Sequence, residues 1–284
     1  MSNDRIHRAT SDDGTEIAGR VHGQGPPLVL VHGALADGDT AWTPLLPFLS
    51  NRFTCYAMST RNRGLSGESD DLSPPRLIQD VAAFAESIGE PVGLMGLSGG
   101  ALLSLGAARS SGAVSAVAAY EPPIFEVITE AVFRRFTDTI ARMTELTADG
   151  ELAGAAQTFV EFVTNEEELA SVAEMDFFEA LAPNVLVQLR EFQQMRDYDG
   201  PAPTAPEELA KITAPVLLLH GTRSNPPNWF TDGVDHVASH VTNAHVRKIT
   251  GAGHLAPIVE PERTAAELTR FLRASEAMSS EPRP

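Results

Sequence analysis

The sequence predicts an α/β fold, with a mostly parallel, doubly wound sheet and an inserted helical cap. Short, continuous apolar runs recur along the chain, and stretches with helical spacing separate them. Such runs are typical of strands buried on both faces, and strands that alternate with helices form right-handed crossovers. One long stretch has no strand pattern, and this predicts the cap.

The first element is a predicted β-hairpin over residues 5–22. Apolar and polar residues alternate on both sides of Asp12-Asp13-Gly14, whose glycine can take a positive φ. A continuous apolar run at residues 28–31 predicts the first strand buried on both faces. The later strands are expected at residues 53–58, 92–96, 114–120, 215–220 and 246–250.

Helices are predicted between these strands. Pro74-Pro75 opens one, whose apolar residues keep helical spacing up to Gly89. Two others are expected at residues 101–109 and 261–274.

The region between Pro123 and about Leu209 shows only helical patterns, at residues 127–146, 152–163, 166–173 and 184–198. It is too long for a connecting loop. We therefore expect a core domain of residues 1–123 and 210–278 and a helical cap of residues 124–209. Residues 279–284 are expected to be a disordered tail.

Composition limits the classes of partner. The chain has 284 residues, 43% of them hydrophobic, and a net charge of −17. A nucleic-acid partner is not expected, because phosphate binding needs clustered Lys and Arg, and anionic membrane surfaces are disfavoured for the same reason. The single Cys55 excludes a disulfide framework and is expected to be a buried thiol. With no signal-peptide pattern and no apolar run near the roughly 18 residues of a membrane span, the chain is expected to be cytoplasmic.

The segment Gly96-Leu97-Ser98-Gly99-Gly100 joins a predicted strand to a predicted helix. A serine on such a sharp turn is exposed as a nucleophile, and the helix that follows directs its N-terminal N–H groups at the reacting centre. Side chains at Gly96 and Gly100 would collide across the turn. Ser98 is therefore the predicted nucleophile, against the alternative of a solvated serine on a glycine-rich turn.

A serine nucleophile needs a base. His254 follows the final strand in Gly251-Ala252-Gly253-His254, so it is expected at the same edge of the sheet as Ser98. His32 and His220 also end strands, but each precedes a glycine and is expected to order a loop. His236, His240 and His245 have near-helical spacing, but no carboxylate or cysteine pattern accompanies them, so no metal site is predicted.

Acyl transfer also needs two N–H donors for the developing oxyanion. The N–H of Gly99, directly after the nucleophile, is one candidate. Ala34, in the loop after the first buried strand, is the other, with Leu35 as the alternative.

These segments together resemble a known family. His32-Gly33, Arg61-Asn62-Arg63-Gly64-Leu65-Ser66-Gly67, the Ser98 turn and the His254 segment resemble landmarks of the α/β-hydrolase superfamily in their usual order, over roughly residues 5–275. The resemblance implies acyl transfer or related chemistry without a cofactor, with the cap forming the substrate pocket. Tyr120-Glu121-Pro122-Pro123 and the pattern around Ala182-Pro183-Asn184 are similar to a bacterial capped subgroup.

The sequence differs from the family pattern at the carboxylate that should orient the histidine. Members usually carry an Asp in the loop after the penultimate strand, but here Ser224 stands near that position. In some branches the acid follows the strand after the nucleophile helix, which is Glu121 in this chain, and a carboxylate there would orient His254. Glu121 is the predicted acid. Asp232, Asp235 and the absence of any acid remain alternatives.

The predicted function is a serine hydrolase acting on a small or medium, largely apolar ester, thioester or lactone. The alternatives are a lyase, cyclase or decarboxylase that uses Ser98 and His254 for acid–base chemistry, and a non-catalytic binding module. We expect a small-molecule substrate, and a homodimer stays open. The expected substrate contacts are Leu35, Trp42, Tyr120 and Phe125. Apolar cap residues are expected to line an acyl pocket in part and to form the cap core for the rest: Phe125, Phe133, Phe136, Phe159, Phe162, Phe177 and Phe178.

Overall fold

The computed structural model describes residues 5–280, with side chains up to residue 275. Its sheet has eight strands in the order β1-β2-β4-β3-β5-β6-β7-β8. The strands are β1 (Arg5–Thr10), β2 (Glu16–Gly23), β3 (Pro27–Val31), β4 (Thr54–Met58), β5 (Val92–Leu97), β6 (Val114–Tyr120), β7 (Val216–Gly221) and β8 (Ala244–Ile249).

The sheet is antiparallel at one edge and parallel elsewhere. The predicted hairpin is present: β1 and β2 pair antiparallel around a turn in which Gly14 has φ 88°. Strand β2 also pairs antiparallel with β4, and all later neighbours pair in parallel. The predicted mostly parallel α/β fold is therefore confirmed.

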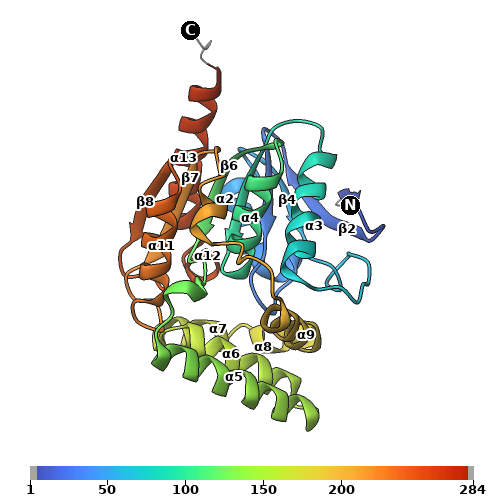
Figure 1. Ribbon diagram of the computed structural model, residues 1–284, viewed down its shortest axis with the longest axis vertical. Helices are drawn as coiled ribbons and strands as arrows, with labels where there is room; N and C mark the ends of the chain where they lie inside the picture. Colours follow the sequence, from blue (N-terminus) through green and yellow to red (C-terminus); the bar gives the residue numbers. More distant parts are fainter. Residues whose placement is uncertain (1–4, 281–284) are drawn as a thin grey trace.

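Helices cover both faces of the sheet (Figure 1). Val29 and Val31 of β3 face one apolar cluster, and Leu30 between them faces the other, as the two-residue period of a strand requires. The first cluster includes residues of α3 (Pro74–Ser87), α4 (Gly99–Ser110) and α11 (Trp229–His240). The second includes residues of α2 (Leu46–Leu49), α12 (Ala256–Val259) and α13 (Pro261–Ser280).

A layer of helices lies across one end of the sheet, below it in Figure 1. This helical layer consists of α5 (Glu130–Ala148), α6 (Leu152–Val163), α7 (Glu166–Ala173), α8 (Phe177–Leu181) and α9 (Val185–Asp197). The short helices η1 (Phe125–Val127), η2 (Ala182–Asn184) and α10 (Pro206–Leu209) belong to the same stretch of chain. As predicted, residues 121–215 contain no strand. The division into a core domain and a cap stays a prediction.

One expectation changes, at the end of the last helix. Helix α13 runs to Ser280, so residues 279 and 280 are helical and not part of a disordered tail; residues 281–284 lie outside the described residues. Cys55 is fully buried, as expected, and burial raises the pKa of its thiol to about 12. Across residues 5–280, none of the helices combines the length and the apolar character needed to cross a membrane.

Candidate active site

Ser98 lies at the turn between β5 and α4 with φ 55° and ψ −121°. A positive φ is strained for a non-glycine residue and is common where function requires it. The turn is held by the Ser98 N–H, which donates to the Tyr120 carbonyl at the end of β6 (2.9 Å). The Ser98 side chain lines a cavity, so the turn presents its hydroxyl there.

The glycines on both sides of Ser98 are required by close backbone contacts. A Cβ at Gly96 would lie 2.3 Å from the Gly100 carbonyl oxygen, and one at Gly100 would lie 2.2 Å from that of Val31. Neither contact is tolerable, because a backbone atom cannot move aside as a flexible side chain does. The steric reason inferred from the sequence for this pattern is confirmed.

The structure brings His254 and Glu121 together. The Nδ1 atom of His254 lies 2.7 Å from Oε2 of Glu121, and both side chains are buried. With Glu121 ionised, Nδ1 carries the proton, which leaves Nε2 as the basic nitrogen. His254 and Ser98 line the same cavity.

The second carboxylate oxygen of Glu121 is also bound. Oε1 accepts hydrogen bonds from the Gly221 N–H (2.7 Å) and from the Ser224 hydroxyl. Ser224, near the position at which the family resemblance implied an Asp, thus contacts the Glu121 carboxylate. Glu121 itself has φ 46°, a second strained position at the carboxyl end of a strand.

The alternative acids are elsewhere. Asp232 and Asp235 lie on α11 with exposed side chains. Since the Nδ1 atom of His254 is already bound to Glu121, the geometry favours Glu121 over both.

Two aromatic side chains position His254. The ring of Phe230 stacks on the imidazole, with the centroids 4.3 Å apart and an interplanar angle of 17°. The Tyr120 hydroxyl donates to the Gly253 carbonyl at 2.6 Å, and burial keeps the pKa of this hydroxyl well above its ordinary value. Phe230 was not singled out from the sequence, since an aromatic residue at helical spacing is indistinguishable from ordinary core.

A second residue missed from the sequence is Glu168 of α7. Its Oε1 accepts hydrogen bonds from the Gly253 N–H (3.0 Å) and the Leu255 N–H (3.1 Å), on either side of His254. The side chain is 5% exposed, and burial raises the pKa of its carboxyl to about 7. No local pattern marks it, because α7 opens with three consecutive glutamates.

The N–H groups that could bind an oxyanion are distinguished by their surroundings. The Gly99 N–H belongs to the first residue of α4, so it has no partner within the helix. Ala34 lines the cavity beside Ser98, whereas the Leu35 N–H donates to Oε1 of Gln188 at 2.9 Å. The structure thus favours Ala34 over the alternative Leu35.

Side chains from the helical layer fix the conformation of Leu35, which has φ 64°. The amide of Asn184 donates to the Leu35 carbonyl at 2.9 Å. Gln188 receives a second hydrogen bond from Nη2 of Arg63 (2.9 Å), and the same nitrogen donates to Glu191 (2.9 Å). These contacts join the loop after β3 to α9.

The other strand-end histidines order loops, as expected. The Nε2 atom of His32 accepts from the Thr60 N–H at 3.0 Å, and Nδ1 donates to the Gly33 carbonyl at 2.8 Å. Burial, with Arg63 nearby, lowers the pKa of His32 to about 4, which keeps the ring neutral. His220 similarly donates from Nδ1 to the Gly221 carbonyl.

The cavity beside Ser98 and His254 is small and mostly apolar, with a volume of about 40 Å³. Its walls come from the loop after β3, from α6 and α8, and from the segment after His254. The lining side chains, besides Ser98 and His254, are Gly33, Ala34, Ala36, Ala41, Leu97, Phe159, Val160, Val163, Phe177, Leu181, Leu255 and Ile258.

None of the four expected substrate contacts lines this cavity. Leu35, Trp42 and Tyr120 are fully buried and are not among its lining residues. Each belongs to the apolar core, which its size favours. This placement does not support the expected direct contact with a substrate, and for Tyr120 the structure gives the bond to Gly253 instead.

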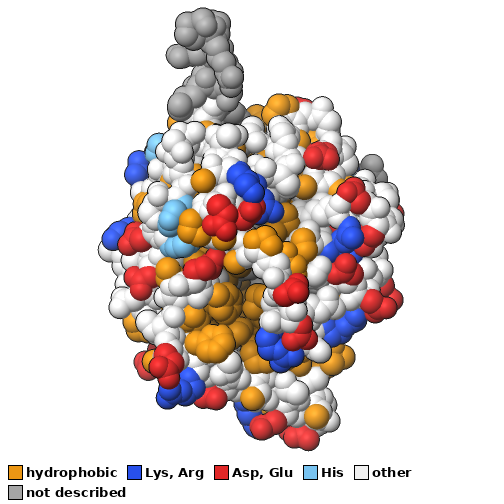
Figure 2. Space-filling model, viewed as in Figure 1, with side chains coloured by type: hydrophobic (Ala, Val, Ile, Leu, Met, Phe, Trp, Pro, Cys, Tyr) orange, Lys and Arg blue, Asp and Glu red, His pale blue; other side chains and the backbone are white. Residues whose placement is uncertain are grey.

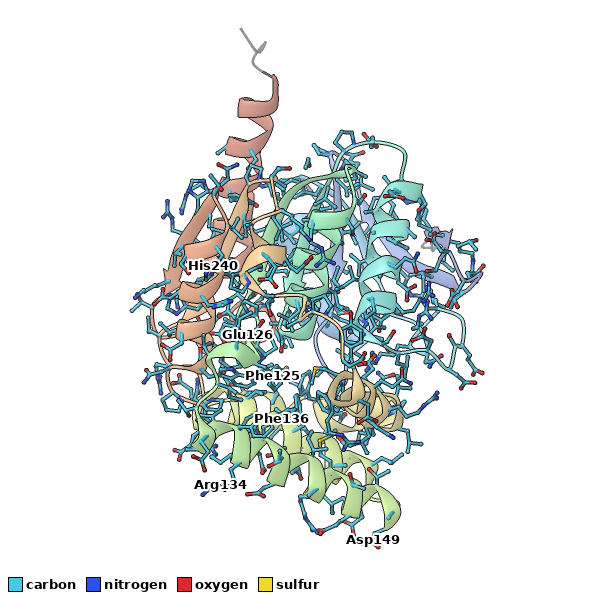
Figure 3. All side chains as sticks on the ribbon, in the orientation of Figure 1. Phe125, Glu126, Arg134, Phe136, Asp149 and His240 are labelled. Carbon is cyan, nitrogen blue, oxygen red and sulfur yellow. The ribbon has the colours of Figure 1, made fainter. Side chains whose placement is uncertain are left out.

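Phe125 lies near an apolar hollow on the surface and does not line the cavity beside Ser98. Figure 2 shows hydrophobic side chains gathered in a depression between the core and the helical layer. Phe125 and Phe136 meet there, as Figure 3 shows, with ring centroids 5.4 Å apart. Of the aromatic residues expected in the acyl pocket, Phe159 and Phe177 line the cavity beside Ser98.

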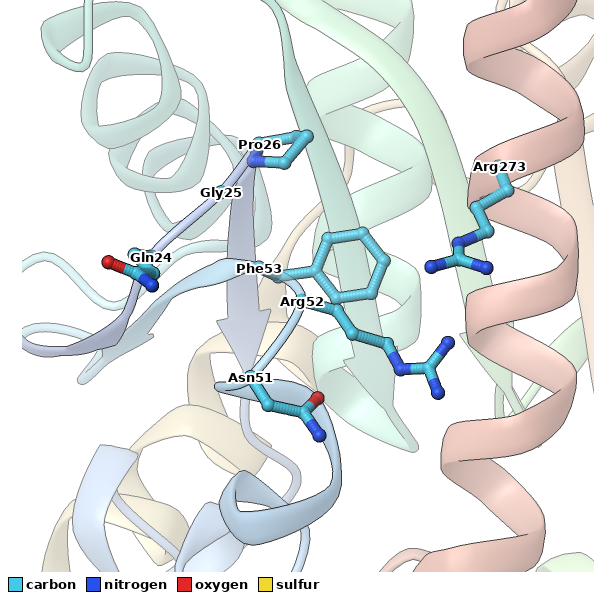
Figure 4. Close-up of a pocket in the computed structure, with 7 residues that line it drawn as sticks. All are labelled: Gln24, Gly25, Pro26, Asn51, Arg52, Phe53 and Arg273. Carbon is cyan, nitrogen blue, oxygen red and sulfur yellow. The ribbon is translucent and has the colours of Figure 1, made fainter.

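A larger hollow, of about 630 Å³, lies at the amino ends of β3 and β4 (Figure 4). Arg52 and Arg273 point into it, and Gln24, Asn51 and Phe53 also line it. Its lining contains neither a histidine nor a nucleophilic side chain. Size alone therefore does not identify the reacting centre.

Two histidines of α11 bind backbone carbonyls. His236 donates to the Thr204 carbonyl, and His240 donates to that of His236. Among the residues that the structure describes, no group of three or more His, Cys, Asp or Glu is arranged to hold a metal ion.

Comparison with known proteins defines the class. The sequence profile of the Alpha/beta hydrolase family matches residues 28–267. A pimeloyl-[acyl-carrier protein] methyl ester esterase from Stenotrophomonas maltophilia is 26% identical, over 89% of this chain and 95% of that protein. An alpha/beta hydrolase from Sphaerobacter thermophilus is 28% identical, with a TM-score of 0.75 over 94% of this chain and 100% of that one. An esterase from Rhodococcus sp. ECU1013 shares the fold at 23% identity, with a TM-score of 0.76 over 94% and 98% of the two chains.

This chain belongs to the α/β-hydrolase family. Like its relatives, it is a hydrolase.

Proposed function

We propose that the protein hydrolyses esters of small, apolar acyl groups through an acyl-enzyme on Ser98. The observation that carries the proposal is the Glu121–His254 hydrogen bond beside the cavity that Ser98 also lines. A serine on a strained turn, an imidazole and a buried carboxyl group together supply nucleophile, base and orienting acid.

In the first half of the reaction, the Ser98 hydroxyl oxygen attacks the ester carbonyl while Nε2 of His254 accepts its proton. The negative charge that develops on the carbonyl oxygen is stabilised by the N–H groups of Ala34 and Gly99. The intermediate collapses, the carbon–oxygen bond to the alcohol breaks, and His254 returns the proton to that alcohol.

In the second half, His254 takes a proton from water, whose oxygen attacks the acyl carbon. The bond to the Ser98 oxygen then breaks and the proton returns to Ser98, which releases the carboxylic acid. Glu121 accepts the Nδ1–H throughout and stabilises the imidazolium.

The cavity supports the choice of substrate. Its walls are apolar, and it has room for only a few water-sized groups, since about 10–15 Å³ holds one water centre. A short hydrocarbon chain suits such a space. The similarity to a methyl ester esterase agrees with an ester as the scissile group.

Two measurements test the proposal. A fluorophosphonate should label Ser98, seen as a mass shift on the peptide that contains it. Release of p-nitrophenol from p-nitrophenyl acetate, butyrate and octanoate should be fastest for the short esters and disappear in Ser98→Ala and His254→Ala. Absence of labelling in the folded protein would refute the acyl-enzyme and favour the lyase-type alternative.

A further inference from the structure

The first turn of α7 makes hydrogen bonds to two loops of the candidate site, the loop after β7 and the loop that carries His254. Nδ2 of Asn165 donates to the Arg223 carbonyl at 3.1 Å, in the loop that carries Ser224. Oε1 of Glu168 receives the N–H groups of Gly253 and Leu255. One helical turn therefore contacts the histidine loop and the loop that binds Glu121.

This contact leaves no free space at Gly253. A Cβ there would lie 2.4 Å from Nδ2 of Asn165 and 2.4 Å from Oε2 of Glu168. A side chain at Gly253 would therefore displace both groups from their present positions. Both N–H groups around His254 depend on the same acceptor.

Packing and hydrogen bonding alone do not require a carboxyl group at position 168. A neutral amide oxygen would accept both N–H groups without the cost of burying a charge. Instead, a carboxyl stands here whose Oε2 is buried and has no hydrogen-bond partner in the described part of the chain. The titratable groups that face it are His254, which favours its charged form, and Glu121, which opposes that form.

We propose that Glu168 is a positioning residue for His254, which fixes the loop around the imidazole through two N–H groups and adds a second negative charge beside the imidazolium. This inference rests on the proposed Ser98–His254–Glu121 chemistry. Helix α7 would then affect catalysis by positioning His254, although none of the α7 side chains lines the cavity.

The test uses the full chain and p-nitrophenyl acetate as substrate. Loss of both acceptor bonds in Glu168→Ala should lower kcat about 100-fold, the scale of a small misplacement of a catalytic group, with KM little changed. Glu168→Gln keeps an acceptor oxygen and should restore most of kcat. Without the negative charge, its kcat should also reach half-maximum at lower pH, because the imidazolium becomes easier to deprotonate.

Glu166→Ala is the matched control, since Glu166 lies in the same turn with an exposed side chain. The inference is wrong if Glu168→Ala keeps the wild-type kcat, or if Glu168→Gln is as slow as Glu168→Ala with an unmoved pH profile. Should Glu168→Ala fail to fold, Glu168→Gln alone decides, through its kcat and its pH profile. Failure of the proposed function is distinct, because the wild type itself would then show no labelling of Ser98.

Discussion

Oε2 of Glu121 and Nδ1 of His254 lie 2.7 Å apart, across the 133 residues of sequence that separate them. The bond joins the end of β6 to the loop after β8, with β7 between them in the sheet. The Glu121 side chain passes the end of β7, where Gly221 and Ser224 bind its other oxygen.

Replacing Glu121 by Gln should lower kcat by several orders of magnitude, up to about 10⁴-fold, because the amide cannot stabilise the imidazolium or fix its tautomer. Asp232→Asn is the control and should leave kcat within about two-fold, as expected for an exposed surface site. The opposite pattern in steady-state kinetics would transfer the role of the acid to Asp232.

Tyr120→Phe should destabilise the protein by about 1 kcal/mol, since the Gly253 carbonyl loses its shorter hydrogen bond and keeps the longer one from the Ala256 N–H (3.4 Å). We also expect a lower kcat, because that carbonyl belongs to the residue before His254. Tyr56→Phe is the control. The Tyr56 hydroxyl makes no hydrogen bond among the described residues, so the urea midpoint of this variant should stay near that of the wild type. Equal midpoints for the two variants would contradict the bond.

Gly100→Ala should destabilise the protein by about 3 kcal/mol or more, at the upper end of overpacking, because its Cβ would lie 2.2 Å from the Val31 carbonyl oxygen. Gly112→Ala is the control, since a Cβ there meets nothing within 4 Å. Thermal unfolding of both variants measures the difference, and a small shift for Gly100→Ala would show that the turn can relax.

Leu181→Ala should enlarge the cavity and shift the preference in kcat/KM toward longer acyl chains. The cost in stability should be about 2–5 kcal/mol, as for other buried leucines. Leu146→Ala removes another buried leucine, on α5, that does not line the cavity, so this variant should keep the wild-type preference for acyl chain length. If both variants change it alike, the cavity is not the acyl site.

The stability of Glu168→Gln relative to the wild type should increase as the pH rises from about 4.5 to about 7. The pKa of the Glu168 carboxyl is higher in the folded wild type than in the unfolded chain. The folded protein therefore binds more protons than the unfolded chain in this pH range, and the stability of the wild type falls as the pH rises. Glutamine lacks this titration. Urea unfolding of both proteins at about pH 5 and about pH 8 tests it, and a pH-independent difference would contradict the burial effect.

The sequence was sufficient to predict the parallel sheet and the Ser98 turn, because both depend on local signals. Continuous apolar runs indicated the buried strands, and glycines marked the close contacts around Ser98. Glu121 was predicted as the acid because the family resemblance implies that position in some branches, and the structure puts it 2.7 Å from His254. This contact joins residues far apart in the chain, so local patterns alone could not have predicted it.

The contacts of the helical layer were not predictable in the same way. Glu168 is one of several glutamates in α7, and only the packing of that helix on the histidine loop separates it from its exposed neighbours. Trp42 and Tyr120 were expected to contact substrate because large aromatic residues suit both pockets and cores. Which of the two applies depends on tertiary packing, and here both are fully buried.

Ser98 and Glu121, the proposed nucleophile and acid, directly follow neighbouring strands, where Leu97 of β5 is paired with Tyr120 of β6. Their spacing is therefore set by a sheet ladder instead of a loop. The loop after β7 contributes the Ser224 hydroxyl that binds Glu121, and its Arg223 carbonyl accepts from Asn165 at the start of α7. A library that varies this loop but keeps Arg223 and Ser224 would leave the two proposed groups in register.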